Sequence, residues 1–300
     1  MMKYIYAQLK GGLGNQLFIY AHAKSISVNQ NRKLVLDTFS GFINDEKYKR
    51  TYELEKFCIS PDNLISNDKS MFSRKFIKRI SLFLSKCLPK STKFYLAESS
   101  LGFDSGLLDC GVQSKHLYID GYWQSEKYFE SIKEIIYNDF QLRVQVSEEI
   151  VTLGQALRES NSVSVHVRKF VNGSSNYPSN LNMDYYERSF KLIEQKIDNP
   201  IYYIFSEPNA IDSKLRVYFS NKSCIFIADL ASKLTTENDF YLMSKCNHYI
   251  IANSTFSWWS AWLGEQSSKT SIVIAPKIFI DTGPSGWGFH GLIPDRWIQT

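Results

Sequence analysis

The sequence predicts an α/β protein built of two packed halves. Its 300 residues, 44% of them hydrophobic and 15% aromatic, exceed what one ordinary core accommodates. In the second half, short β-branched runs alternate with segments of helical length, which is typical of a parallel, doubly wound sheet. The first half opens with an apolar run, a glycine-rich turn and a helical pattern.

The first half is expected to span residues 1–145. Its expected strands are Tyr4–Leu9, Lys33–Leu36 and His116–Trp123, and its expected helices are Leu17–Asn29 and Glu126–Asn138. A long polar and aromatic region separates the second strand from the third, and it contains an amphipathic helix near 72–90. Ser147 is expected to begin the first helix of the second half, residues 146–300.

The second half alternates strands and helices more plainly. Its expected strands are Ser162–Arg168, Ile201–Ser206, Cys224–Ala228, His248–Asn253 and Ser271–Pro276. Its expected helices are Asp184–Ile197, Pro208–Ser220, Glu237–Lys245 and Thr255–Gly264. In an open parallel sheet, ligands bind at the carboxyl ends of the strands, so polar residues at these ends are candidate site residues.

Composition excludes several classes of protein. No run approaches the ~20 apolar residues that span a bilayer, and the first residues lack a signal-peptide pattern, so we expect a cytoplasmic protein. The five cysteines are scattered without a C-x-x-C pair, which predicts neither a disulfide framework nor a zinc site.

Positive charge is concentrated in one segment. Eight Lys or Arg and no acid lie between Lys69 and Ala97, although the net charge of the chain is only +5. Apolar residues recur there at helical spacing, which predicts a helix with a basic face. Two interpretations stay open: peripheral contact with the inner face of the cytoplasmic membrane, or a core-facing helix with a basic solvated side. Because these basic residues are confined to one short segment, nucleic-acid binding is not expected.

The first loop, QLKGGLGNQLF, has three interpretations. Gly12 and Gly14 match the start of G-x-G-x-x-G, and Asp37 follows at the distance of a ribose-binding acid, which would suit NAD. A tight turn with an Asn capping the helix would need no ligand. Asn15 and Gln16 offer directional hydrogen bonds that a pyrophosphate held by backbone amides does not require, which favours other chemistry.

A histidine and an arginine end the strand SVSVHVR. His166 and Arg168 point to one face of the sheet, while Val165 and Val167 pack on the other. An imidazole and a guanidinium aimed at one point suit a phosphate. This pair predicts an anion site at the carboxyl edge of the sheet.

A helix begins directly after the strand HYIIAN. The N–H groups of its first turn, with the hydroxyls of Ser254, Thr255 and Ser257, form a second anion site. Two such anion sites at neighbouring strand ends predict that a diphosphate binds there. Glu207 and Asp229 end two further strands, and they either accept hydrogen bonds from a base or ribose or cap helices in solvent.

Five stretches occur in order between about Tyr4 and Pro276: GGLGNQLF, GYWQSEKYF, VHVR, IFSE and IIANSTFSWWSAWLG. They resemble the bacterial α-1,2-fucosyltransferases of glycosyltransferase family eleven. The resemblance implies a glycosyltransferase-B fold of two Rossmann-like halves facing across a cleft. It also implies an inverting enzyme that needs no metal or other cofactor and moves L-fucose from GDP-fucose to the 2-hydroxyl of galactose in an O-antigen-like surface-polysaccharide precursor. A lipid-linked precursor would give the basic helix a membrane to lie on.

With these patterns, the resemblance implies roles for individual residues. Arg168, His166 and Asn15 are the expected catalytic residues. The expected donor-binding residues are Gly12, Gly14, Gln16, Lys169, Ser206, Glu207, Asp229, Asn253, Ser254, Thr255, Phe256 and Ser257. The expected acceptor-side residues are Asp120, Trp123, Gln124 and Glu126.

The chain departs from the family pattern H-x-R-R-x-D. Lys169 replaces the second arginine and cannot form a planar fork, and Val171 stands where the acid is expected. The general base is therefore left open among Asp120, Glu126 and Glu207.

Three alternatives follow from the same residues. The donor is a different GDP-sugar; or the chain is an NAD-dependent oxidoreductase built on Gly12, Gly14 and Asp37; or it is a non-catalytic sugar-nucleotide binder, which the missing acid at Val171 favours.

Overall fold

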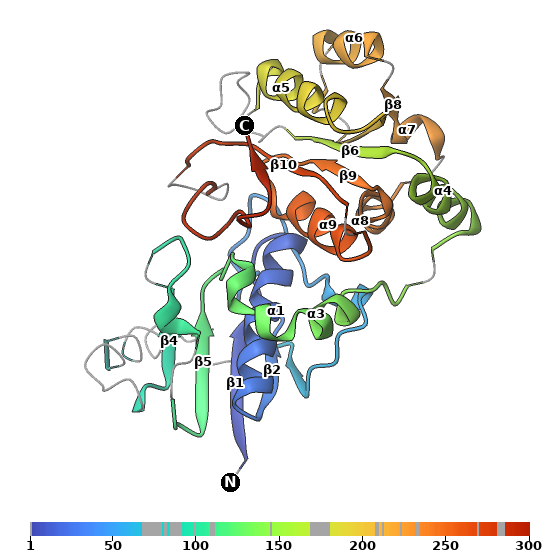
Figure 1. Ribbon diagram of the computed structural model, residues 1–300. Helices are drawn as coiled ribbons and strands as arrows, with labels where there is room; N and C mark the ends of the chain where they lie inside the picture. The colour runs from blue at the N-terminus through green and yellow to red at the C-terminus, as the bar shows by residue number, and fades with distance from the viewer. Residues whose placement is uncertain are drawn as a thin grey trace. The chain divides into compact units, whose positions relative to one another are not determined.

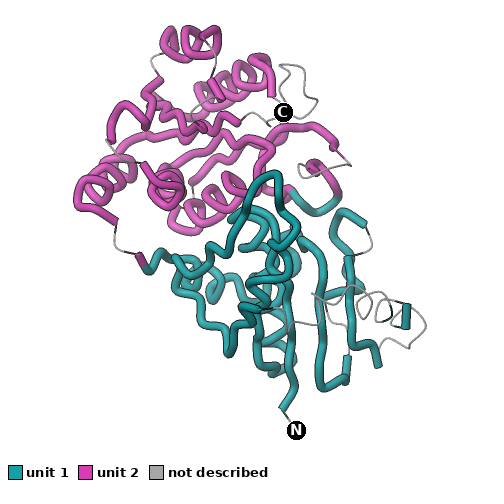
Figure 2. Tube along the Cα trace, turned by 180° about the vertical axis from the view of Figure 1, so that it is seen from behind, with its two compact units in different colours: residues 1–143, 290–292 teal, residues 144–289, 293–300 magenta. Residues whose placement is uncertain are grey.

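The computed structural model describes the chain as two compact units (Figure 2). Unit 1 is residues 1–143 with 290–292, and unit 2 is residues 144–289 with 293–300. The residues described are 2–67, 80, 83–84, 92–98, 100–108, 112–144, 146–168, 181–207, 210–211, 213–222, 224–231, 234–268, 270–280 and 286–300. Most of the basic segment near 72–90 lies outside them, so the expected helix there is not described.

Unit 1 contains a parallel sheet with the order β3-β2-β1-β5-β4. Its strands are β1 (Lys3–Gln8), β2 (Arg32–Asp37), β3 (Asn63–Ile65), β4 (Tyr95–Ala97) and β5 (His116–Asp120). The order reverses at β1, where Ala7 pairs with Leu36 on one side and with Ile119 on the other. The carboxyl ends of β1 and β5 therefore lie side by side, which is where a sheet of this kind binds ligands.

Helix α1 (Leu13–Asn29) packs against β1 and β2 (Figure 1). It begins four residues earlier than expected, because Gly12 is its N-cap residue and Gly14 lies inside its first turn. The segment after β5 forms two short 3₁₀ turns, Glu126–Tyr128 and Glu130–Ile132, before α3 (Lys133–Asp139). The single helix expected at Glu126–Asn138 is therefore wrong over its first half.

Unit 2 contains a second parallel sheet, with the order β11-β10-β9-β6-β7-β8. Its strands are β6 (Ser162–Val167), β7 (Ile201–Ser206), β8 (Ile225–Phe226), β9 (His248–Ile250), β10 (Val273–Ala275) and β11 (Ile298–Gln299). Numbered within the unit, this is the 3-2-1-4-5-6 order of a dinucleotide-type Rossmann sheet, whose reversal lies between β6 and β9.

Helices cover both faces of the unit 2 sheet (Figure 1). They are α4 (Glu148–Glu159), α5 (Met183–Glu194), α6 (Ser213–Asn221), α7 (Ile227–Leu230), α8 (Thr236–Lys245) and α9 (Thr255–Glu265). Val163, Val165 and Val167 pack with residues of α5 and α6 in one apolar core. On the other face, α4 contacts α8, and α8 contacts α9. Both faces of β6 are thus buried, as its apolar sequence predicts.

Candidate functional site

An arginine and a serine meet where the strand order of unit 2 reverses. Arg168 follows β6 and Ser254 follows β9, and Arg168 Nη1 donates a hydrogen bond to Ser254 Oγ over 3.0 Å. Their strands are neighbours, with Val165 paired to Ile250. The structure therefore brings together the two anion-binding devices that the sequence predicts at separate strand ends.

His166 lies beside the hydrogen-bonded pair of Arg168 and Ser254, which we call the Arg168–Ser254 junction, and its ring is neutral. Its side chain is only 6% exposed, and its ring centroid lies 6.1 Å from that of Phe256 in α9. Burial, together with the smaller effect of the Arg168 charge, lowers the pKa of His166 to about 3. His166 therefore adds no positive charge at neutral pH, and its contribution is one N–H donor.

The first turn of α9 has no side-chain cap. Ser254 is the N-cap residue, but its hydroxyl accepts from Arg168 instead of from the helix. Thr255 and Phe256 are half-buried at the start of the helix. Ser257 is fully buried, and its hydroxyl donates to the carbonyl of Ser254. Among the three hydroxyls that the sequence predicts at the anion site, that of Ser257 is therefore bonded to the helix backbone. Asn253, at the preceding position, is also buried.

The acids that the sequence places at strand ends have different surroundings. Glu207 follows β7, and its Oε1 lies 3.5 Å from Nε of Arg168, so it is part of the junction. Ser206, the last residue of β7, is half-buried. Asp229 lies in α7 rather than at the end of a strand, because β8 stops at Phe226, and it pairs with Arg216 over 3.3 Å in an exposed position. The expected strand Cys224–Ala228 is wrong at this end.

In unit 1, the glycine loop is held by its own amide side chains. Gln16 is fully buried; its Nε2 donates to the carbonyls of Gly11 and Thr51, and its Oε1 accepts from the N–H of Glu53. Expected to bind the donor, Gln16 instead fixes the backbone around the loop. Asn15 is in the first turn of α1 and does not cap it, and its Oδ1 accepts from Gln124 Nε2 over 2.7 Å.

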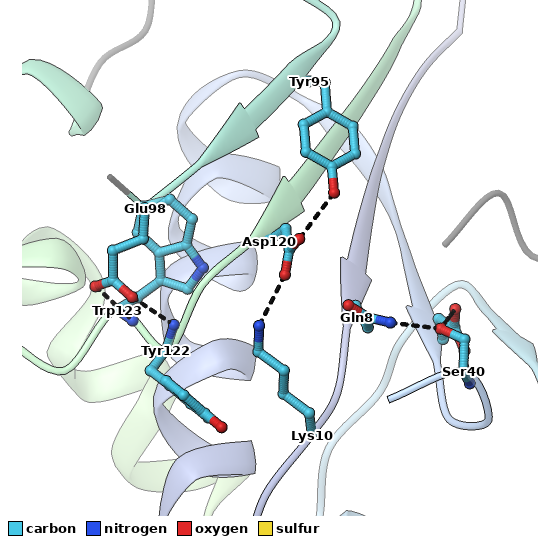
Figure 3. A network of polar contacts seen from close by, with 9 residues as sticks. Gln8, Lys10, Ser40, Tyr95, Glu98, Asp120, Tyr122 and Trp123 are labelled. Atoms are coloured by element: carbon cyan, nitrogen blue, oxygen red, sulfur yellow. Dashed lines mark hydrogen bonds and ion pairs between the residues drawn. The ribbon is translucent and has the colours of Figure 1, made fainter. Parts of the chain in front are cut away.

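A polar network occupies the carboxyl ends of β1 and β5 (Figure 3). Asp120 accepts from Lys10 Nζ at 2.7 Å and from the hydroxyl of Tyr95 at 2.8 Å. Lys10 also lies over the ring of Tyr122, 5.0 Å from its centroid. An ion pair between Lys10 and Asp120 therefore lies where the strand order of this sheet reverses. Asp120 is one of the residues that the sequence predicts on the acceptor side.

Glu98 is a member of this network that the sequence did not predict. It follows β4 and accepts the backbone N–H groups of Tyr122 at 2.7 Å and of Trp123 at 3.2 Å (Figure 3). Burial raises its pKa, although these two hydrogen bonds oppose the shift. Trp123 has a φ of 56° and no exposed surface, so its side chain belongs to the core rather than to an acceptor surface. Glu126, in the next turn, is half-buried.

Asp37 is not available to a ribose. It is 1% exposed, and its carboxylate accepts from the N–H groups of Phe39 and Ser40 and from the Ser40 hydroxyl. The acid on which the NAD interpretation depends therefore stabilises the turn that follows β2.

Two residues at the departure from the family pattern, Lys169 and Val171, lie outside the described residues. Within the described part of the chain, no group of three or more His, Cys, Asp or Glu is arranged to hold a metal ion. Among the same residues, no helix has the length and apolar character needed to cross a membrane.

Comparison with known proteins identifies the family. A family model described as "Glycosyl transferase family 11" matches residues 4–283. The O-antigen biosynthesis glycosyltransferase WbnK of Escherichia coli is 30% identical over 98% of this chain and all of its own length. The alpha-1,2-colitosyltransferase of Escherichia coli is 29% identical over 99% of both chains.

A solved structure supports the fold. A mutant of Arabidopsis thaliana FUT1 in complex with GDP matches with a TM-score of 0.53 and 11% identity, over 95% of this chain and 72% of that chain. The fold is of the glycosyltransferase-B type, with two Rossmann-like halves. With residues 4–283 matched by the family model, the alternative of an NAD-dependent oxidoreductase is excluded and the chain belongs to glycosyl transferase family 11.

Proposed function

We propose that this protein is an inverting, metal-independent galactoside α-1,2-fucosyltransferase. It transfers L-fucose from GDP-fucose to the 2-hydroxyl of a galactose in an O-antigen-like precursor. The observation that carries the proposal is the Arg168–Ser254 junction at the strand reversal of unit 2, in a chain that belongs to family 11. The relative WbnK, a glycosyltransferase of O-antigen biosynthesis, supports the choice of acceptor.

The donor's diphosphate binds at the carboxyl edge of the unit 2 sheet. The guanidinium of Arg168, oriented by Ser254 and Glu207, meets the charge that develops on the leaving GDP. The N–H groups of Thr255 and Phe256 at the start of α9, and one N–H of His166, add further donors. Each well-placed donor contributes about 3 kcal/mol in the transition state. Lys169, the residue that follows Arg168 in the sequence, carries a second positive charge.

The acceptor binds to unit 1, at the carboxyl ends of β1 and β5. The acceptor oxygen bonds to the anomeric carbon from the side opposite GDP, so the β-linked donor gives an α-linked product. As this bond forms, the bond to the diphosphate oxygen breaks and the hydroxyl proton passes to a base. We assign the base to Asp120, because it lies in unit 1 among the groups at the carboxyl ends of β1 and β5, where the acceptor binds, whereas Glu207 lies in unit 2 beside Arg168. We assign Asn15 and Gln124 to the sugar as a paired donor and acceptor.

The test is GDP release with GDP-fucose and a galactose-terminated oligosaccharide in the presence of EDTA. We expect turnover without added metal and an α-1,2 linkage in the product. Strict dependence on a divalent cation, or no turnover with GDP-fucose, would contradict the proposal.

A second donor, GDP-colitose, is favoured by the relative that transfers colitose, which is 29% identical over nearly the whole chain. Colitose is the 3-deoxy counterpart of fucose, so the two donors differ in a single hydroxyl. Running both donors under the same conditions, and comparing kcat/KM, decides between them.

The acceptor precursor is proposed to be lipid-linked, in which case the basic segment near 72–90 contacts an anionic bilayer from the cytoplasmic side. Co-sedimentation with vesicles containing anionic lipid, compared with neutral vesicles, tests this contact. Equal sedimentation with both kinds of vesicle would exclude it.

A further inference from the structure

The guanidinium of Arg50 lies directly against the glycine loop of unit 1. A Cβ atom on residue 12 would overlap Nη1 of Arg50 and lie 3.0 Å from its Cζ, and no atom of another residue is among the three nearest. The φ of Gly12 is −76°, which any residue adopts. Glycine at position 12 therefore leaves room for the guanidinium in this place, and a larger residue there would displace it, whereas the backbone itself does not require glycine.

Several contacts hold Arg50 in this position. Its guanidinium lies over the ring of Tyr48, 5.0 Å from the centroid, and its backbone N–H donates to Asp45 Oδ2. Gln16 fixes the residues that follow, because it bonds the carbonyl of Thr51 and the N–H of Glu53 from inside α1. The buried Gln16 thus connects the helix to the segment that carries Arg50.

The charge of Arg50 is not neutralised by the part of the chain that the structure describes. The side chain is half-buried, and no described carboxylate lies within ion-pair distance of it. The carboxylate of Asp45 accepts two backbone N–H groups, from Tyr48 and Arg50, instead. Tyr122, whose ring lies under the ammonium group of Lys10 in the network at the ends of β1 and β5, interacts electrostatically with Arg50. Arg50 therefore stands near the proposed acceptor site.

We propose that Arg50 binds a phosphate-type anion of a substrate beside the glycine loop, and that Gly12 and Gln16 seat it for this purpose. A held, planar guanidinium that pairs with none of the described carboxylates suits the paired oxygens of a phosphate. The identity of the substrate rests on the proposed function. The anion is either the diphosphate of the donor or a phosphate carried by the acceptor.

The variants are Arg50→Ala, Arg50→Lys and, as a matched control, Lys49→Gln, which removes one exposed positive charge from the same loop. If the anion belongs to the donor, Arg50→Ala weakens GDP binding, measured by calorimetry, by about 10- to 100-fold. If it belongs to the acceptor, the KM for a phosphate-bearing acceptor rises by the same factor while GDP binding is unchanged. Arg50→Lys recovers only part of the loss, and Lys49→Gln changes neither quantity more than about twofold.

A double-variant cycle tests whether Gly12 acts by leaving room for the guanidinium of Arg50. Gly12→Ala alone displaces the guanidinium and reproduces the loss of Arg50→Ala, whereas in the Arg50→Ala background the added methyl group has no further effect. Thermal unfolding of each variant checks that the fold is kept. A further loss on adding Gly12→Ala to Arg50→Ala would show that Gly12 itself approaches the ligand and would overturn the seating.

A binding measurement separates this inference from the proposed function. In an Arg168→Ala background, which lacks the guanidinium of unit 2, inorganic pyrophosphate is titrated with and without Arg50→Ala. We expect the affinity to fall about tenfold when Arg50 is removed, whether or not the enzyme turns over a GDP-sugar. If Arg50→Ala changes neither this affinity nor GDP binding nor the acceptor KM, the inference is wrong.

Discussion

Nη1 of Arg168 and Oγ of Ser254 lie 3.0 Å apart across the two strand ends between which the order of the unit 2 sheet reverses. The hydrogen bond uses the hydroxyl that would otherwise cap α9, so the N–H groups of its first turn have no side-chain cap. One contact therefore does two things: it orients a guanidinium and leaves helix N–H groups for an anion. Under the proposed function, Arg168 and the start of α9 bind the diphosphate of the donor together.

Arg168→Ala is expected to reduce transfer by at least about 100-fold, because the leaving GDP loses its fixed positive charge. Unfolding temperature is expected to change little, since the side chain lies beyond the end of β6 and not in the apolar core of unit 2. Arg188→Ala, which removes an exposed arginine of α5, is the control and is expected to leave turnover intact. Near-normal transfer by the Arg168 variant would refute the assignment.

Ser254→Ala is expected to cost less, about tenfold, because it removes the orienting hydroxyl but keeps the guanidinium. The loss is expected in both GDP affinity and kcat, and it should vanish in an Arg168→Ala background, since the hydroxyl acts through the arginine. An equal loss in both backgrounds would mean that Ser254 acts on the substrate independently.

Asp120→Asn is expected to lower kcat about 10²- to 10⁴-fold while GDP affinity, measured by calorimetry, stays unchanged, because an amide cannot take the acceptor proton. The amide can still accept the hydrogen bond from Tyr95. Asp62→Asn is the control, since it breaks an ion pair with Lys33 that is also in unit 1 but far more exposed. Wild-type kcat for the Asp120 variant would assign the proton to another group.

The sequence predicts the elements whose signals are local. The strand Ile201–Ser206 is confirmed to the residue, and Ser147 is the N-cap residue of α4 as expected, accepting from the N–H of Ile150. The opposite faces of His166 and Val165 follow from alternation along β6 alone. The positions of Arg168 and Ser254 at adjacent strand ends follow from the α/β pattern.

Other features depend on contacts between distant parts of the chain. Strands β3, β4 and β11 have three residues or fewer, so they carry no alternation and form because a neighbouring strand pairs with them. Glu98 takes its place only because β4 pairs with β5, and Arg50 takes its place only because Gln16 holds the loop that carries it. Nothing in the sequence near Arg50 distinguishes it from a surface arginine.

The stability of unit 1 is expected to fall in mild acid because of His22. Its ring is 1% exposed between Trp123 and Tyr128, and burial lowers its pKa to about 3. Below its ordinary pKa of about 6.5, the unfolded chain takes up a proton that the folded chain refuses, so the free energy of unfolding decreases as the pH falls. Between pH 7 and pH 5 this amounts to about 2 kcal/mol.

Urea unfolding of His22→Phe at pH 7 and pH 5 measures this contribution. The phenyl ring keeps the packing, so the decrease between the two pH values is expected to shrink by about 2 kcal/mol, leaving the similar contribution of His166 in unit 2. His290→Gln, at an exposed position, is the control. The same decrease in the wild type and in His22→Phe would show that the ring is protonated in the folded state.

Gly264→Ala is expected to destabilise unit 2 by about 1–3 kcal/mol through overpacking. A Cβ at position 264 would overlap the hydroxyl of Tyr249 and lie 2.5 Å from its Cζ and 2.8 Å from the carbonyl oxygen of Ser244. Tyr249 is fully buried and Ser244 contributes backbone, so neither can move away easily. Tyr249→Phe in the same chain removes the first overlap but not the others, so partial rescue of the urea midpoint is expected. Full stability of Gly264→Ala alone would show that α9 can shift on β9, and Arg168 would then lose its fixed partner at the start of that helix.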